Sequence, residues 1–366
     1  MSKNLTRRDA LLLAAGLCGP VVRARAQPAP PLKVGFVYVS PVGDAGWTYQ
    51  HDLGRREMER TLGDRVRTTV VESVAEGADG ERVIRDLARQ GHGLIFATSF
   101  GYLEATLRVA AEFPAVRFEH AGGYKTAPNV NTYNARYYEG RYLAGMIAGA
   151  ASRSGIAGYA AGLPVPEVVQ GIDAFALGMR AVNPKAVVRV LWLNTWFDPA
   201  REAEAALALV NQGADVLTNH SASAAVAEAA QQQFGARGVR FIGYHSDMRA
   251  HAPDAQLAAV THHWGRYYSG VARAVLDGRW VAEPVWGGLR EGMVALEAID
   301  PKLPAAVRAS VEARRQAIVA GRFQPFAAPL VDNRGRRRLV AGALDDAAIL
   351  RLDWLADGVV GTLPGS

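Results

Sequence analysis

Short apolar runs alternate with segments of helical spacing along most of the 366 residues, and this alternation restricts the fold more than any other feature. The run at residues 33–39 is β-branched and almost continuously apolar, as expected of a strand buried on both faces. It ends at Ser40 and Pro41, and helical spacing follows at residues 49–62. Strands that repeatedly lead into helices predict a doubly wound parallel sheet, which is an α/β fold.

The alternation occurs twice, once in each half of the chain. Further strands are predicted at residues 67–72, 93–98, 116–120 and 129–134, and then at 155–161, 187–194, 215–219 and 239–244. Helices are predicted at residues 80–90, 103–113, 138–152, 167–182, 198–212 and 222–234. The chain is expected to cross back near residues 257–262 and to continue through residues 293–299 and a helix at 304–320.

The helix predicted at residues 138–152 is rich in Gly and Ala, and small residues at helical spacing permit close backbone approach. We interpret this helix as the crossing point between two lobes with a ligand cleft between them. The first lobe is predicted to contain residues 32–150 and about 264–330. The second is predicted to contain residues 151–263 and about 331–361.

Residues 1–26 have the features of an export signal. A twin-arginine pair, Arg7 and Arg8, precedes an apolar segment at residues 10–17, and Ala24-Arg25-Ala26 forms a cleavage signal. The apolar segment is too short to span a membrane as a helix. We therefore predict a periplasmic protein exported by a twin-arginine signal peptide; a disordered basic N-terminus is the alternative.

The single cysteine, Cys18, lies inside this segment. Leu17 occupies the position where a lipoprotein signal needs a small residue, which argues against lipidation without excluding it. Cleavage near Gln27 would leave no cysteine, and therefore neither a disulfide nor a thiolate nucleophile.

The export signal also explains most of the positive charge. The whole chain has 41 Lys and Arg against 35 Asp and Glu, but residues 1–26 hold five of the bases and one of the acids. The remaining net charge of +2 gives no reason to expect a nucleic-acid partner. The basic cluster at residues 334–338 is more typical of a solvated turn than of a binding patch.

The loops that follow the predicted strands carry large aromatic side chains and isolated acids. These residues are Asp44, Trp47, Phe100, Tyr124, Trp196, Phe197, Asp198, Asp247, Trp264 and Trp286. Ligands bind at the carboxyl ends of strands in open α/β sheets. Rings can stack on a flat ligand while carboxylates accept its hydrogen bonds. Any one of these aromatics is more often a packing residue, and Asp44 could be a helix cap, but their recurrence at strand ends favours a planar heterocycle as ligand.

Several short motifs, in their order and spacing, resemble the basic-membrane-protein (BMP, PnrA-like) family of substrate-binding proteins of ABC transporters. The motifs lie at residues 33–37, 44–47, 98–102, 131–145, 192–199, 246–248, 286–289 and 353–355. The resemblance implies a type I periplasmic-binding-protein fold, with two Rossmann-like lobes, a hinge and three crossovers. It also implies a monomer that captures a purine nucleobase or nucleoside by hinge closure and delivers it to a membrane permease.

The resemblance assigns roles to particular residues. Trp47 corresponds to the stacking aromatic of the first loop and Asp44 to its acid. Trp196 or Phe197 corresponds to the stacking aromatic of the second lobe, and Asp247 to the acid that holds the ring edge or the ribose. The remaining predicted ligand-binding residues are Phe100, Tyr124 and Trp264.

Two departures from the family pattern leave the ligand open. Ala45 and Gly46 replace the polar pair expected in the first loop, and Ala222 stands where a polar residue is expected. Base and nucleoside therefore both remain, as does another heterocycle such as a flavin.

An enzyme is the main alternative class. A dinucleotide-dependent oxidoreductase needs Gly-x-Gly-x-x-Gly after the first strand, and this loop lacks it. His262 and His263 could suggest a metal, but adjacent strand residues point to opposite faces. No enzyme activity, cofactor or metal is therefore expected. A ligand-binding sensor module would share both fold and site, and the sequence does not separate it from a transport protein.

Overall fold

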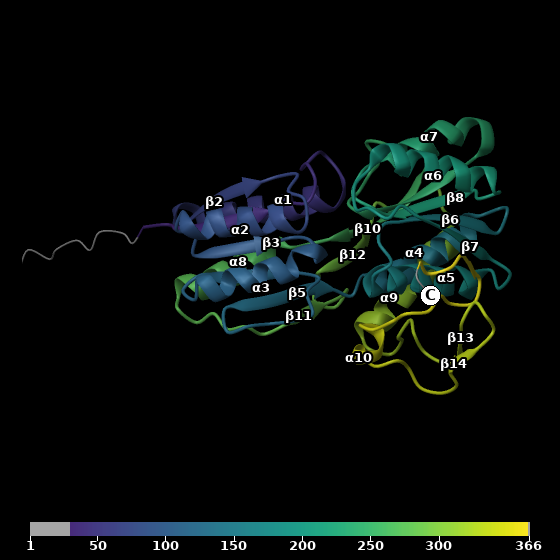
Figure 1. The fold of residues 1–366 in the computed structure, drawn as a ribbon. Helices are drawn as coiled ribbons and strands as arrows, with labels where there is room; N and C mark the ends of the chain where they lie inside the picture. The colour runs from purple at the N-terminus through teal and green to yellow at the C-terminus, as the bar shows by residue number, and fades with distance from the viewer. Residues whose placement is uncertain (1–29, 365–366) are drawn as a thin grey trace, which may run out of the picture. The chain divides into compact units, whose positions relative to one another are not determined.

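The computed structural model describes residues 30–364, so the predicted export signal, Cys18 and the cleavage site lie outside the described residues. Residues from Leu32 onward form one compact unit. This unit contains two large sheets, each with helices on both faces (Figure 1), and one two-stranded sheet. No helix within residues 30–364 has the length and apolarity that crossing a membrane requires.

The first sheet has the strand order β11-β5-β4-β3-β1-β2, and all of its pairings are parallel. Its strands alternate side chains between two faces, so Phe36 packs in one core cluster and Val37 in another. Helices α1 and α8 cover the face of Phe36, and α2 and α3 cover the face of Val37. The elements are β1 (Leu32–Val37), α1 (Gly46–Leu62), the 3-10 helix η1 (Gly63–Arg65), β2 (Val66–Val71), α2 (Ala78–Arg89), β3 (Leu94–Ala97), the 3-10 helix η2 (Phe100–Tyr102), α3 (Leu103–Glu112), β4 (Arg117–Ala121), β5 (Val130–Ala135), α8 (Gly265–Leu276) and β11 (Val285–Gly287).

The second sheet has the order β12-β10-β9-β8-β6-β7-β15, and only the β10–β12 pairing is antiparallel. Helices α4 and α5 lie on one face, and α6 and α7 on the other. Asp198 caps α6 by accepting a hydrogen bond from the Arg201 amide. The elements are α4 (Tyr137–Ala151), β6 (Ile156–Ala161), α5 (Pro166–Val182), β7 (Val187–Trp192), α6 (Pro199–Asn211), β8 (Val216–His220), α7 (Ala225–Arg237), β9 (Arg240–His245), β10 (Gln256–His262), β12 (Val294–Glu297) and β15 (Val359–Val360).

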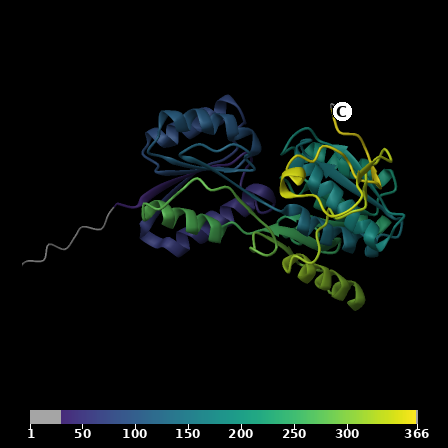
Figure 2. The same cartoon turned by 90° about the horizontal axis from the view of Figure 1, so that it is seen from below.

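The C-terminal residues lie over the second sheet and its helices, where Figure 2 shows them in yellow. They include α9 (Ala305–Val319), the antiparallel pair β13 (Leu330–Val331) and β14 (Arg337–Leu339), and α10 (Asp346–Ile349). In the basic cluster, Arg336 and Arg338 each donate from Nε to the buried carboxylate of Asp332, at 2.8 Å. Two of the clustered arginines therefore hold this segment together.

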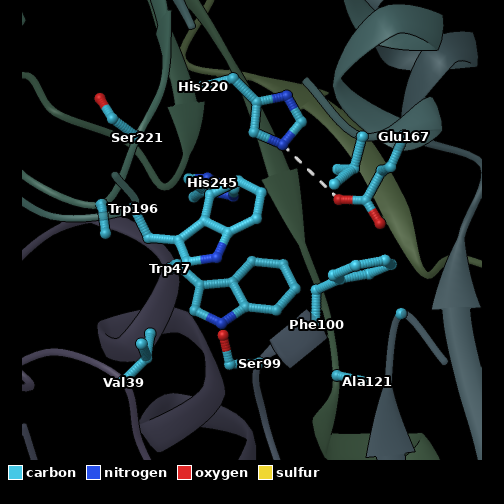
Figure 3. A pocket seen from close by; sticks show the side chains of 13 residues that line it. Val39, Trp47, Ser99, Phe100, Ala121, Glu167, Trp196, His220, Ser221 and His245 are labelled. Atoms are coloured by element: carbon cyan, nitrogen blue, oxygen red, sulfur yellow. Dashed lines mark ion pairs between the residues drawn. The ribbon is translucent and has the colours of Figure 1, made fainter. Parts of the chain in front are cut away.

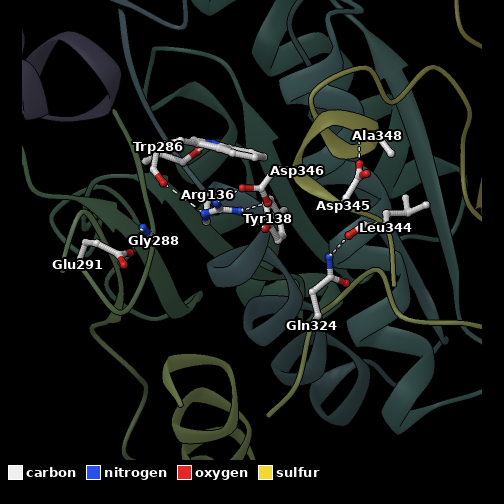
Figure 4. A network of polar contacts seen from close by, with 11 residues as sticks. Arg136, Tyr138, Trp286, Gly288, Glu291, Gln324, Leu344, Asp345, Asp346 and Ala348 are labelled. Carbon is white, nitrogen blue, oxygen red and sulfur yellow. Dashed lines mark hydrogen bonds and ion pairs between the residues drawn. The ribbon is translucent and has the colours of Figure 1, made fainter. Parts of the chain in front are cut away.

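The chain passes between the two sheets three times: from β5 to α4, from β10 to α8, and from β11 to β12. Arg136, in the first passage, bonds to the third: its amide donates to the Gly287 carbonyl at 2.7 Å and its Nε to the Trp286 carbonyl at 3.2 Å. Its guanidinium lies 4.1 Å from the Trp286 ring and makes two hydrogen bonds to Asp346 (Figure 4). The first and third passages are thus fastened together and to α10.

The sheets place several segments near the predicted lobe boundaries. Helix α4, predicted in the first lobe, lies on the second sheet, and residues 256–262 form β10 inside the second sheet, with the passage following at His263. Within residues 264–330, α8 and β11 accompany the first sheet, but β12 pairs with β10 and α9 packs on α4. Pairing with β12 gives β10 partners for its outer backbone groups, which would otherwise form an open edge. We therefore propose that the division between lobes in this part of the chain lies after Gly287.

The glycine-rich helix α4 makes its closest contacts with α5, within the second lobe. A Cβ added at Gly145 would overlap the Phe175 carbonyl, and one added at Gly178 would overlap the Tyr142 carbonyl. The absence of side chains at these positions lets the two helix backbones touch. The stripe of small residues therefore fixes the α4–α5 packing.

We expect Gly178→Ala to destabilise the protein by about 1–3 kcal/mol, because the added methyl group forces the helix backbones apart. Thermal unfolding measures the effect. Gly270→Ala is the matched control, since Gly270 is an exposed helix residue with nothing within 4 Å of its Cβ position. That change should stabilise by a few tenths to about 1 kcal/mol. Equal melting temperatures for the two variants would contradict the close-packing argument.

Candidate functional site

A pocket lies where the carboxyl ends of the two sheets face each other. Its walls enclose about 490 Å³ of empty space, including the part open to solvent. Figure 3 shows the rings of Trp47, Phe100 and Trp196 in its centre. Six lining residues come from the first lobe and seven from the second: Val39, Trp47, Ser99, Phe100, Ala121 and Gly122, and Val165, Glu167, Trp196, His220, Ser221, Ala222 and His245.

Trp47 is positioned by its own helix and by both lobes. It is the second residue of α1, and its Nε1 donates to the Thr98 carbonyl at 2.7 Å. Gly46, just before it, has φ +91° and no room for a Cβ, which would overlap the Ala222 carbonyl. The Gly46 amide donates to Ser246 Oγ at 2.8 Å, so the start of α1 is bonded to the second lobe. Only glycine fits this position.

The three large rings of the pocket leave their faces free of one another. Among the described residues, Trp196 makes a ring contact with His220 alone, and Phe100 makes one with Tyr124 alone, at 6.1 Å. Trp47 meets the edges of other rings, including His51 at 4.3 Å and His245 at 5.2 Å. Within residues 30–364, no ring contact joins Trp47, Phe100 and Trp196 to each other. A flat molecule can therefore lie among them and stack.

One carboxylate, that of Glu167, lines the pocket. Glu167 belongs to the first turn of α5. Its Oε2 accepts a hydrogen bond from Asn134 Nδ2 at 2.8 Å, and its Oε1 lies 3.5 Å from His220 Nε2. Asn134 is part of β5 in the first sheet, so this contact also joins the two lobes. Among the described residues, no Lys or Arg pairs with Glu167.

A buried guanidinium lies beneath the second-lobe side of the pocket. Arg141 of α4 is fully buried and donates to Thr218 Oγ1 at 2.9 Å and to the Asn219 carbonyl. Its charge lies 3.3 Å from the centre of the Tyr244 ring, where a cation–π interaction is favourable. These contacts fix the ends of β8 and β9, which carry His220 and His245 into the pocket.

The histidines around the pocket are neutral at ordinary pH. Burial lowers the pKa of His51 to about 3. Burial also lowers the pKa of His220, His245 and His262, with smaller contributions from neighbouring histidines and Arg141; at His220 the contact with Glu167 opposes this shift. Neutral rings can donate and accept hydrogen bonds at the same time.

We expect stability to fall as the pH drops below about 6.5. The unfolded chain gains protons on its histidines there, while the folded chain, with depressed pKa values, does not. His51 alone should cost about 2 kcal/mol between pH 7.5 and 5. Denaturant unfolding of His51→Gln at pH 7.5 and pH 5 should therefore show a smaller loss than in the parent protein.

His263→Gln is the control for this measurement. The Glu297 carboxylate, 3.2 Å away, raises the pKa of His263, so His263 supports the fold on the acidic side. The His263→Gln variant should therefore lose more stability on acidification than the parent protein does. Superimposable pH profiles for His51→Gln and the parent protein would contradict the assignment of His51 as a buried neutral residue.

Three of the predicted site residues, Trp47, Phe100 and Trp196, line this pocket together. Tyr124 lies next to it, in an adjoining cavity that shares Phe100, Gly122 and Glu167 with the pocket. Tyr124 is 67% exposed and contacts Phe100. Tyr124 therefore lies at the mouth of the pocket.

The other four predicted residues lie elsewhere. Asp44, Asp247 and Trp264 line a separate cavity, and Phe197 points to solvent. Asp247 turns away because its carboxylate bonds to Arg249 and to Gln256, at 2.6 and 2.7 Å. Asp44 does not cap α1 and contacts His251 at 3.1 Å.

Trp264 is buried between α1 and the start of α8, with only 1% of its surface exposed. Trp264 is therefore in a packing position and does not face the pocket.

Sequence reasoning missed Glu167, His220 and His245 as pocket residues. Each lies at or just after the carboxyl end of a strand in the second sheet, which is the signal used for the aromatics. Among the histidines, only His262 and His263 were considered, as metal ligands. Residues 30–364 contain no cluster of three or more His, Cys, Asp or Glu side chains arranged to hold a metal ion.

Comparison with known proteins identifies the family. Residues 32–321 match the model of the PnrA-like ABC transporter substrate-binding proteins. A purine-binding protein of Brucella abortus is 47% identical over 96% of this chain and 100% of its own length. A putative ABC transporter glucose-binding protein of Haloferax volcanii is 34% identical over 91% of this chain and 81% of its own.

Solved structures agree on the fold. A solute-binding protein of an ABC transporter from Aeropyrum pernix superimposes with a TM-score of 0.69 at 20% identity, covering 80% of this chain and 93% of that one. Another, from Conexibacter woesei, gives a TM-score of 0.64 at 22% identity, covering 80% and 98%. The predicted α/β periplasmic-binding-protein fold is confirmed. The chain belongs to the PnrA-like family of ABC transporter substrate-binding proteins, as its sequence motifs predicted.

Proposed function

We propose that this protein binds a purine and presents it to an ABC permease. The observation that carries the proposal is the set of three large rings, Trp47, Phe100 and Trp196, which share one pocket without stacking on each other. Each such aromatic contact with a flat ligand contributes about 0.5–1.5 kcal/mol beyond area burial. The likeness to the Brucella purine-binding protein supports the same ligand class.

Capture involves closure of two lobes around the ligand. The two lobes supply opposite walls of the pocket and meet through Gly46–Ser246 and Asn134–Glu167. The passages tied together by Arg136 form the hinge. Binding proteins of this kind close by rotating one lobe against the other about a few connecting residues. The protein works as a periplasmic monomer after export through a twin-arginine signal peptide, and it binds without catalysing a reaction.

The first test is to identify the bound molecule. The purified protein is unfolded, the released small molecules are analysed by mass spectrometry, and the refolded protein is titrated while tryptophan fluorescence is followed. The titrants are adenine, hypoxanthine, xanthine, guanine, adenosine, inosine and glucose. We expect saturable quenching by at least one purine and none by glucose. Saturation by glucose alone, or recovery of a flavin, would overturn the purine assignment.

We expect Trp196→Leu to weaken purine binding by about 10–100-fold, because it removes a large stacking surface. Trp192→Leu is the matched control, since Trp192 lies outside the pocket lining and donates to the Thr362 carbonyl. Its affinity should stay within about threefold of the parent. Isothermal titration calorimetry measures both variants, and equal affinities for the two would exclude Trp196 as a stacking residue.

A further inference from the structure

Glu167 and Trp196 both carry polar atoms into a pocket whose other lining residues are mostly aromatic and aliphatic. The Trp196 Nε1 is buried and has no hydrogen-bond partner among the described residues. A buried donor without a partner costs free energy, so a ligand acceptor placed against it is favoured. Glu167 supplies a hydrogen-bond acceptor, its carboxylate, on the pocket wall beside His220 (Figure 3).

The carboxylate of Glu167 retains unused acceptor capacity. Two carboxylate oxygens can accept about four hydrogen bonds. Asn134 uses one of them, and His220 Nε2 lies 3.5 Å from the other oxygen. Burial lowers the pKa of His220 despite the opposing effect of the Glu167 carboxylate, which favours a neutral ring beside that carboxylate.

The position of this carboxylate is fixed in advance. Asn134 holds Oε2 from the first lobe, and α5 holds the backbone of Glu167 from the second. The side chain is 19% exposed and lies where the pocket joins the outer cavity. Gly122 lines the same junction with φ +72°, and a Cβ there would lie 3.7 Å from Glu167 Oε2. The carboxylate therefore meets a ligand that enters from the outer cavity.

We propose that Glu167 determines specificity by accepting a hydrogen bond from a ring N–H or exocyclic N–H of the ligand, while Trp196 Nε1 donates to a ligand acceptor. The ligand class is a flat heterocycle with an N–H donor and a hydrogen-bond acceptor. This inference rests on the proposed purine function and narrows it. A heterocycle whose nitrogens are all alkylated or unprotonated offers Glu167 only acceptors, and it is rejected because the carboxylate would lose water without gaining a partner.

The test compares N–H purines with caffeine, a purine of the same flat shape that has no N–H group. The tightest binder among adenine, guanine, hypoxanthine and xanthine is titrated against the parent protein and Glu167→Gln by calorimetry. We expect the variant to lose about 10–100-fold in affinity, as for a hydrogen bond to a charged group. Caffeine should bind the parent at least about 100-fold more weakly than that purine.

The variant should also bind caffeine more tightly than the parent does, because its amide can donate to a caffeine carbonyl. This reversal separates hydrogen bonding from the steric effect of the methyl groups. Glu104→Gln is the matched control: Glu104 is also a first-turn helix acid, but it pairs with Lys125 outside the pocket. Its affinities should stay within about twofold of the parent for both ligands.

The outcomes distinguish this inference from the proposed function. Tight binding of a purine that is unchanged in Glu167→Gln, or equal binding of caffeine by the parent, overturns the role of Glu167 and leaves purine binding in place. Binding of no purine at all overturns both. If Glu167→Gln does not fold, the comparison of caffeine with the N–H purines in the parent protein still decides.

Discussion

Parallel strand pairing is the constraint on which the site depends. Every strand of the first sheet, and every strand of the second except β12, runs in one common direction within its sheet. All carboxyl ends therefore lie at one edge of each sheet, and the segments that follow them are brought together however distant they are in sequence. The pocket uses loops after β1, β3, β4, β6, β7, β8 and β9, a spread of more than 200 residues. Helices on both faces make this possible, since each crossover returns the chain to start the next parallel strand.

This constraint explains what could be read from the sequence. Strand positions followed from apolar runs, and the candidate residues followed from what comes after each strand. Trp47, Phe100 and Trp196 were found in this way because large aromatics in loops are conspicuous. Glu167 and His245 come from the same edge and carry the same strand-end signal, but only aromatic side chains and aspartates were selected there.

The predicted acids that lie outside the pocket share one physical explanation. Asp247 and Asp44 follow strands or precede a helix, yet each carboxylate finds a partner in its own neighbourhood, Arg249 or His251, and turns from the pocket. His245 has φ +69°, so the chain turns there, and Asp247 two residues later does not share its side: His245 lines the pocket and Asp247 does not. Strand β12 was misplaced for a similar reason: a short apolar run shows that a strand exists but does not show which sheet edge lacks a partner.

The hydrogen bond between Asn134 and Glu167 bears on the rate of ligand release. It spans the two lobes at the junction of the pocket with the outer cavity, so the lobes cannot separate there while it is intact. A ligand that leaves through this junction must wait until the bond breaks. With the closure proposed above, the residence time of the ligand is set by the opening rate of the protein as well as by the ligand's own contacts. A mutation at Asn134, which does not line the pocket, would shorten the lifetime of the complex more than it would slow capture.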